Sequence, residues 1–335
     1  MSHRLENALE LDLESKATEL SRALQEAVLH RLRKRGLVVA ISGGVDSACV
    51  AALGVRALGP ERVFALLLPE RDSSPESLAY GKALCDKLRI SYEVKDIASI
   101  LDATGCYQAR NAAVREVVPE FHPDMPWKIV LASDPLSTET VHFFRLVVRL
   151  HSGEERRYRL LPQAYLRIVA ATNFKQRTRK MLEYYHADRL NYAVAGTPNR
   201  LEYDQGFFVK LGDGAADVKP IAALYKTQVY ALARHLGVIE EILRREPTTD
   251  TYTLEQSQED FYYSLHYSKL DLFLWAKNHG LSAESVSAEL GYTPEQVRRV
   301  YDDIDQKRRA TLYLHSPALL LEHVDEVAIA PSPGA

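Results

Sequence analysis

The stretch that most constrains the fold is VVAISGGVDSACVAAL, residues 38–53. A run rich in Val and Ile ends in Ser-Gly-Gly, and a helical pattern begins at Asp46. Short β-branched runs bounded by glycine are typical of buried strands. Glycines let the backbone approach an anion closely, and the following helix adds its positive end. The stretch therefore predicts a strand, a turn and a helix that together hold a phosphate.

Strand and helix patterns alternate after this turn. We expect strands at 37–41, 63–68 and 90–94, with helices at 46–58 and 77–88 between them. Ser74 followed by Pro75 fits the start of the second helix. This order predicts an α/β fold, a doubly wound parallel sheet with helices on both faces. Ligands of such sheets bind at the carboxyl ends of the strands, where residues 42–47 fall.

The flanking segments are predominantly helical in pattern. Leucines and alanines recur every three or four residues over 5–35, which predicts an amphipathic helix. A helix from Pro162 to about Tyr185 and a strand at 192–195 follow the middle of the chain. The C-terminal part is helical, and TPEQ at 293–296 predicts a capping box.

Residues 104–162 interrupt the alternation. Two strand-like arms, 143–150 and 156–161, are joined by HSGE and carry five arginines, which predicts a β-hairpin. Such a hairpin is either an ordinary solvated element or a lid or docking surface for an anionic ligand. We expect one domain over 1–260 that contains this insertion, a helical extension over 261–323, and a disordered tail over 324–335.

Composition narrows the classes of function. Lys and Arg number 42 against 45 Asp and Glu, so nothing in the charge favours nucleic acid. No apolar run is long enough for a signal or membrane segment, and we expect a cytoplasmic protein without membrane contact. Cys49, Cys85 and Cys106 form no CxxC pair, which predicts core residues. The eleven histidines form no HxxxH or HxH pattern, which argues against a histidine metal site.

The turn differs from the commonest phosphate loops. It contains neither GxxxxGK[ST] nor GxGxxG. Instead, SGGVDS resembles the PP-loop of the N-type ATP pyrophosphatases, which hold the β and γ phosphates of ATP and cut it between α and β. A glycine-rich structural turn is the alternative interpretation.

Further motifs resemble one branch of that superfamily, the ammonia-dependent NAD synthases. They are N-x-x-x-R-T-R from Asn173, a strand ending in G-T at 196–197, Glu202, the loop K-x-G-D-G-x-x-D at 210–217, L-x-K-T at 224–227 and EPTTD at 246–250. They stand in the family's order, and the resemblance covers roughly residues 35–310.

The resemblance implies an ATP-dependent amide ligase. Such an enzyme adenylates the carboxylate of deamido-NAD and transfers ammonia to it, giving NAD⁺, AMP and pyrophosphate, with ATP as co-substrate and Mg²⁺ as cofactor. It also implies a homodimer. No glutaminase domain fits beside this core, so the ammonia is free or comes from a separate glutaminase. Two alternatives stay open: a ligase of the same fold for another carboxylate, and a nucleotide-binding protein without turnover.

The resemblance also assigns roles to residues. The implied catalytic residues are Asp46, Asp213 and Lys226, and the implied metal ligands are Asp46 and Glu202. The implied ATP contacts are Ala40, Ile41, Ser42, Gly43, Gly44, Val45, Asp46, Ser47, Thr197, Lys226 and Thr248. The implied substrate contacts are Arg177, Lys210, Asp217, Gln306 and Lys307, the last two standing where family members often carry a His-Lys pair.

Overall fold

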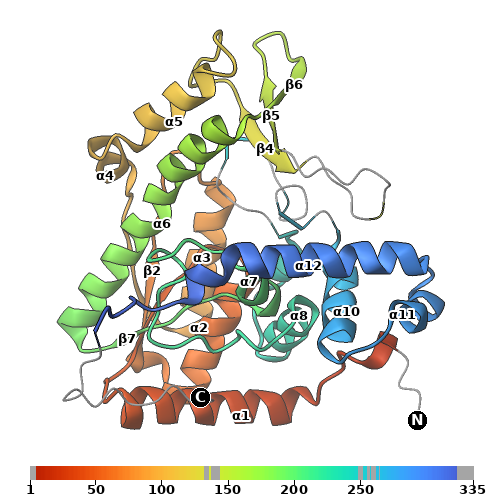
Figure 1. Ribbon diagram of the computed structural model, residues 1–335. Helices are drawn as coiled ribbons and strands as arrows, with labels where there is room; N and C mark the ends of the chain where they lie inside the picture. The colour runs from red at the N-terminus through yellow and green to blue at the C-terminus, as the bar shows by residue number, and fades with distance from the viewer. Residues whose placement is uncertain are drawn as a thin grey trace.

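The centre of the protein is a four-stranded parallel sheet. The computed structural model describes residues 5–131, 136, 144–247, 252–254, 257, 262–263 and 265–322 (Figure 1). The strands are β1 (Leu37–Ala40), β2 (Val63–Leu67), β3 (Ser91–Val94) and β7 (Ala193–Val194), in the order β3-β2-β1-β7. Leu37 pairs with both Val63 and Ala193, which places β1 inside the sheet.

Helices cover both faces of this sheet, as the sequence predicts. One face carries α1 (Leu13–Gln25), α2 (Val45–Leu58), α3 (Pro75–Leu88) and α8 (Lys226–His235). The other carries α4 (Ala98–Ala103), α5 (Cys106–Arg115) and the lower half of α6 (Pro162–Leu190). The neighbours Val38 and Val39 are both fully buried but belong to the cores on opposite faces, so β1 reads as a continuous apolar run.

The N-terminal helix is shorter than its leucine pattern. Asp12 caps α1 by accepting a hydrogen bond from the Ser15 amide (3.1 Å), and the π-helical turn η2 (Glu26–Arg31) ends it. Leu5 lies in a separate 3₁₀ turn, η1 (Leu5–Asn7), and packs into the core of the C-terminal helices. The expected single helix over 5–35 is therefore wrong. The cap at Asp12 separates Leu5, which packs against the C-terminal helices, from the apolar residues of α1, which pack against the central sheet.

The insertion holds a second, antiparallel sheet at the top of Figure 1. The predicted hairpin is confirmed as β5 (Phe144–Arg149) and β6 (Glu155–Arg159), and β4 (Trp127–Leu131) adds a strand that the sequence did not indicate. Trp127 pairs with Val148 and is fully buried with it in a small core against the start of α6. Arg157 and Arg159 of β6 lie on the sheet's other side, whereas Arg156 pairs with Val148 on the core side and is exposed at its edge.

The C-terminal part is helical, as expected. After α7 (Arg200–Gln205) and α9 (Glu240–Arg244) it contains α10 (Tyr267–Asn278), α11 (Ala283–Leu290) and α12 (Pro294–His315). Thr293 and Gln296 form the predicted capping box, with bonds of 2.9 and 3.2 Å. None of the helices in the described ranges is long and apolar enough to cross a bilayer. Residues 324–335 lie outside the described residues, and the domain boundaries stay predictions.

A buried network of charges joins the insertion to the central sheet. The Lys175 ammonium lies 2.9 Å from Glu70 Oε1 and 2.6 Å from Asp72 Oδ2. Arg110 of α5 forms an ion pair with the same Asp72 oxygen, and the Tyr107 hydroxyl donates to Glu70 (2.9 Å). All five side chains are buried. Each of these buried charges has lost its hydration, so it is stable only while its oppositely charged partners are present.

Replacing Asp72 by Asn should therefore unfold the protein more easily. Two buried cations would lose their shared carboxylate, which should lower the free energy of unfolding by about 3–5 kcal/mol. Urea denaturation measures this loss. Glu155→Gln is the matched control, because Glu155 pairs with Arg149 on the exposed hairpin and its loss should leave the midpoint unchanged. Equal midpoints for both variants would contradict the prediction.

Candidate nucleotide-binding site

The glycine turn lies at the carboxyl end of β1, as the sequence predicts. Gly43 has φ +79°, and a Cβ on it would lie 2.5 Å from the Ser77 carbonyl of α3, so only glycine fits there. Ser42 Oγ accepts a hydrogen bond from the Gly44 amide (3.3 Å), and Ser47 Oγ donates to the Gly44 carbonyl (3.0 Å). These bonds fix the turn, and α2 begins directly after it.

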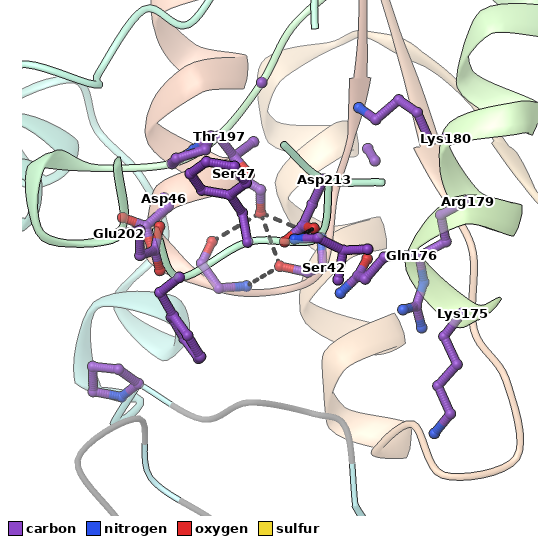
Figure 2. A pocket seen from close by; sticks show the side chains of 18 of the residues that line it. Ser42, Asp46, Ser47, Lys175, Gln176, Arg179, Lys180, Thr197, Glu202 and Asp213 are labelled. Carbon is purple, nitrogen blue, oxygen red and sulfur yellow. Dashed lines mark hydrogen bonds between the residues drawn. The ribbon is translucent and has the colours of Figure 1, made fainter. Parts of the chain in front are cut away.

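Asp46, in the first turn of α2, gathers polar groups from two other helices. It forms a salt bridge with Lys226, whose side chain is 2% exposed. The other carboxylate oxygen of Asp46 accepts a hydrogen bond from the side-chain Nδ2 of Asn199 (3.0 Å). The backbone amide of Asn199 donates to Glu202 Oε2 (3.1 Å). Asn199 therefore places both acids in one corner, and Figure 2 shows them side by side. Burial alone would lower the pKa of Lys226, but Asp46 and Glu202 raise it above its ordinary value.

A buried acid from α10 holds the helix that carries Lys226. Asp271 is fully buried and accepts hydrogen bonds from the amides of Lys226 (3.2 Å) and Thr227 (2.8 Å) and from the Thr227 hydroxyl (2.8 Å). It thus caps the N-terminus of α8 from outside that helix. Burial raises the pKa of Asp271 to about 6, and these hydrogen bonds oppose the rise.

The turn opens into a cavity of about 810 Å³, a size suited to a small molecule. Asp46, Glu202 and Thr197 lie on one side of it, and α6 forms the opposite wall with Lys175, Gln176, Arg179 and Lys180 (Figure 2). The cavity therefore has an acidic corner that can hold a cation and a wall that supplies positive charge to an anion.

The third wall is the loop of residues 206–213. Asp213 lines the cavity, accepts a hydrogen bond from the Val209 amide (2.8 Å), and has its pKa raised by burial. A buried pair of Lys180 and Glu183 (2.7 Å) lines the cavity too, and burial likewise raises the pKa of Glu183. Gly214 packs so closely that a Cβ would lie 2.3 Å from the Phe208 ring. Because it has no side chain, Gly214 allows the chain after this loop to pack directly against Phe208.

The structure brings together most of the residues that the sequence singled out. The cavity is lined by Ala40, Ile41, Ser42, Gly44, Val45, Asp46, Ser47, Arg177, Thr197, Glu202, Lys210, Asp213 and Lys226. Gly43 lies behind the turn against Ser77. Thr248 lies outside the described residues.

Three expected substrate contacts lie elsewhere in the described part of the chain. Asp217 accepts hydrogen bonds from the Val194 amide (2.7 Å) and the Tyr184 hydroxyl (3.3 Å), so it fastens the end of β7. Lys307 pairs with Asp303 one helical turn away (2.7 Å), and Gln306 is exposed on α12. Lys210 lines the cavity but also donates to the carbonyls of Tyr313 (2.7 Å) and Ser316 (2.9 Å) at the end of α12.

Three residues that help to build the site escaped the sequence reasoning. Asn199 carried a signal, since N-R-L-E at 199–202 is a capping-box pattern that fixes Glu202. Asp271 carried none, because its helix is distant in sequence and its role depends on tertiary packing. Arg245, which lines the cavity and donates to Ser77 Oγ (2.7 Å), was also without a local pattern.

Fold and site together define an α/β protein with a cavity built for an anionic, nucleotide-sized ligand. Comparison with known proteins narrows this class. The family model for NAD synthase matches residues 17–119 and 155–310. The NH(3)-dependent NAD(+) synthetase of Rhizobium meliloti is 54% identical over 96% of both chains. That of Thermotoga neapolitana is 37% identical over 79% of this chain and 83% of its own. The chain belongs to the NAD synthase family.

Solved structures agree on the fold. An NMN synthetase from Francisella tularensis superposes with a TM-score of 0.64 at 22% identity, covering 93% of this chain and 99% of that one. An NH3-dependent NAD synthetase from Campylobacter jejuni, in complex with the nitrate ion, gives 0.60 at 24% identity, covering 93% and 100%. At these identities the likeness shows the fold, and the α/β architecture predicted from the sequence is confirmed.

The raised pKa of Asp271 predicts how stability depends on pH. The folded chain binds this proton more tightly than the unfolded chain, whose value is near 3.8, so the group favours folding at acid pH. That contribution is lost as the pH rises through about 6. Relative to Asp271→Asn, which cannot titrate, the wild type should lose about 2 kcal/mol between pH 4 and pH 7. Urea denaturation at both pH values measures the difference, and a constant difference would refute the prediction.

Proposed function

We propose that the protein is an ammonia-dependent NAD⁺ synthetase, which adenylates the carboxylate of deamido-NAD with ATP and transfers ammonia to it. The observation that carries the proposal is the corner where the glycine turn, Asp46, Glu202 and Lys226 meet. Curated relatives of this name match the chain over nearly its full length. The products are NAD⁺, AMP and pyrophosphate, so the enzyme is a ligase that forms a C–N bond.

The acidic corner fits Mg²⁺. Asp46 and Glu202 offer carboxylate oxygens, the donors that hard cations prefer, and Asn199 already orients both. These two residues would hold the ion, which when bound would neutralise charge on the phosphates of ATP. The salt bridge to Lys226 shows that this corner already accepts positive charge at Asp46.

The residues around the turn would bind and orient ATP. Its pyrophosphate end belongs at the Ser42–Ser47 turn, where the N-terminus of α2 contributes its positive end. Lys226 adds a fixed positive charge that stays protonated at neutral pH, because the neighbouring acids raise its pKa. Charge that develops on departing pyrophosphate is stabilised by such groups already in place.

The wall formed by α6 and the 206–213 loop would receive the acyl substrate. Arg177 and Lys210 line this side, and the guanidinium of Arg177 suits a planar anion. The loop that carries Asp213 forms a further wall of the same cavity. Water must be kept from an acyl adenylate, because hydrolysis would waste it, and we assign that role to this loop.

The ammonia source and location complete the proposal. We place ammonia as the free substrate, or as the product of a separate glutaminase, because relatives that match over nearly the full length of both chains carry the name NH(3)-dependent. A cytoplasmic location is supported by three buried, unpaired thiols, Cys49, Cys85 and Cys106, which suit a reducing compartment.

The test is to incubate purified protein with ATP, Mg²⁺, ammonium and deamido-NAD and to quantify NAD⁺, AMP and pyrophosphate. We expect the three products in equal amounts. Asp46→Asn should lower the rate at least about 100-fold, because the variant loses a metal ligand and the partner of Lys226. Glu14→Gln is the matched control, since Glu14 pairs with Arg56 on the surface, and it should keep its rate.

Other outcomes separate the alternatives. AMP that appears only with another carboxylate, such as nicotinic acid mononucleotide, would exclude deamido-NAD and leave a ligase of the same fold. ATP binding without release of AMP or pyrophosphate would leave a non-catalytic nucleotide-binding protein. An unchanged rate in Asp46→Asn would overturn the metal assignment.

The homodimer is part of the proposal. Helix α6 carries three large apolar side chains with more than half of their surface exposed, Leu166, Met181 and Tyr185, and Leu211 and Tyr313 are exposed to a similar extent. Leu166 and Tyr313 also line the cavity. Exposed apolar surface next to an open site indicates a partner surface. A second copy of the chain would cover it and complete the substrate wall.

Met181→Asp should therefore disturb assembly. The wild type should sediment at twice the mass of one 37.8 kDa chain, and the variant should shift toward the monomer because it places a charge in the interface. Its KM for deamido-NAD should rise more than its KM for ATP. Leu32→Asp, at an exposed apolar position directly after η2, should stay dimeric. A monomeric wild type would rule out this arrangement.

A further inference from the structure

Three potential metal ligands meet at the tip of the insertion. His122 and Asp124 lie in the loop between α5 and β4, and His151 lies in the turn between β5 and β6. His122 Nδ1 is 2.6 Å from Asp124 Oδ1, and His151 Nε2 is 3.7 Å from the same oxygen. One ligand atom of each residue lies within 4.8 Å of the other two. All three side chains are exposed to solvent.

The backbone of the first loop is firmly placed. Phe121 and Met125, which flank the two ligands, are both buried in the core of the insertion. The Met125 amide donates to the His122 carbonyl (2.9 Å), which closes a tight turn between them. Phe121 also contacts the buried Trp127 edge to face, with ring centroids 6.3 Å apart. The side chains at 122 and 124 therefore project from a fixed turn.

The second loop is equally constrained. The Gly153 amide donates to the Leu150 carbonyl (2.8 Å), and Gly153 has φ +85°, a conformation that favours glycine. The Arg149 amide donates to the Pro126 carbonyl (2.8 Å), so pairing of β5 with β4 holds the two loops together. The convergence of the three ligands thus follows from the sheet.

From this arrangement we infer a site for a divalent transition metal ion of the Zn²⁺ class, with His122, Asp124 and His151 as ligands. Two imidazoles and one carboxylate are the donors that such ions take, whereas Mg²⁺ and Ca²⁺ prefer oxygen alone. Tetrahedral zinc places its ligand atoms about 3.3 Å apart. The two distances to Asp124, 2.6 and 3.7 Å, bracket that value, and the two histidines lie within 4.8 Å of each other, so side-chain rotations alone can bring the three ligand atoms to one ion. Water would complete the coordination.

This site is separate from the nucleotide cavity. None of the three ligands lines that cavity in the described ranges. The NAD synthase family model matches the chain up to residue 119 and again from residue 155, so the ligands stand in the segment between the two matches. The ion would therefore not take part in amide formation. It would link the β5–β6 turn to the loop before β4 and stiffen the hairpin.

The test uses untagged full-length protein, freed of metal with a chelator and kept in excess Mg²⁺. Titration calorimetry with Zn²⁺ should show one site per chain, and Co²⁺ should give the visible spectrum of a tetrahedral nitrogen and oxygen site. His151→Ala should weaken Zn²⁺ binding at least about 10- to 100-fold, the cost of losing even an outer-shell partner. Asp124→Asn should weaken it as well. His30→Ala removes an exposed histidine that lies in η2, outside the insertion, and this variant should bind Zn²⁺ as the wild type does.

A second measurement reports on the hairpin itself. Zn²⁺ should slow amide hydrogen exchange over residues 144–159 in the wild type and not in His151→Ala. His151→Ala and Asp124→Asn both change exposed side chains, so the melting temperatures of the two metal-free variants should match that of the metal-free wild type. Absence of Zn²⁺ binding by the wild type would overturn the inference. So would equal Zn²⁺ affinity in the wild type and His151→Ala. Neither result bears on the proposed synthetase activity, which is measured at the other site.

Discussion

The salt bridge between Asp46 and Lys226 is the contact on which the site depends. It joins the first turn of α2 to the first turn of α8, two helices that pack on the same face of the sheet. Asn199 fixes the carboxylate from one side, and Asp271 fixes the helix that carries the ammonium from the other. A buried lysine is stable only with such a partner, so the corner is held in place before any ligand arrives.

The rest of the cavity has acidic side chains on one wall and basic side chains on the opposite wall. The acids and Thr197 stand beside the glycine turn, the basic side chains stand on α6, and the 206–213 loop forms a third wall. Helix α6 can carry these charges because its buried lysines each have a carboxylate: Lys175 has Glu70 and Asp72, and Lys180 has Glu183. These ion pairs therefore both stabilise the buried lysines of α6 and place their positive charges in the wall of the cavity.

Local patterns predicted the strand, turn and helix around Asp46 well. Strand, turn and helix follow from a β-branched run, two glycines and an acid, and these signals lie within ten residues of one another. What sequence could not supply was contact between distant segments. Asp271 reaches α8 from another helix, β4 pairs across the insertion, and Leu5 joins the C-terminal core although its spacing fits α1. The histidines at 122 and 151 likewise meet only through strand pairing.

Helix α6 also has a mechanical consequence. Its 29 residues make it about 43 Å long, and it begins in the core of the insertion and ends beside the sheet. The α6 residues that line the cavity run from Tyr165 to Glu183 and are centred near the middle of this length. A rotation of about 2° at the sheet would move the far end by about 1.5 Å and the middle by about half as much. A rigid tilt of α6 would therefore move the insertion and the basic wall of the cavity together, because the same helix carries both.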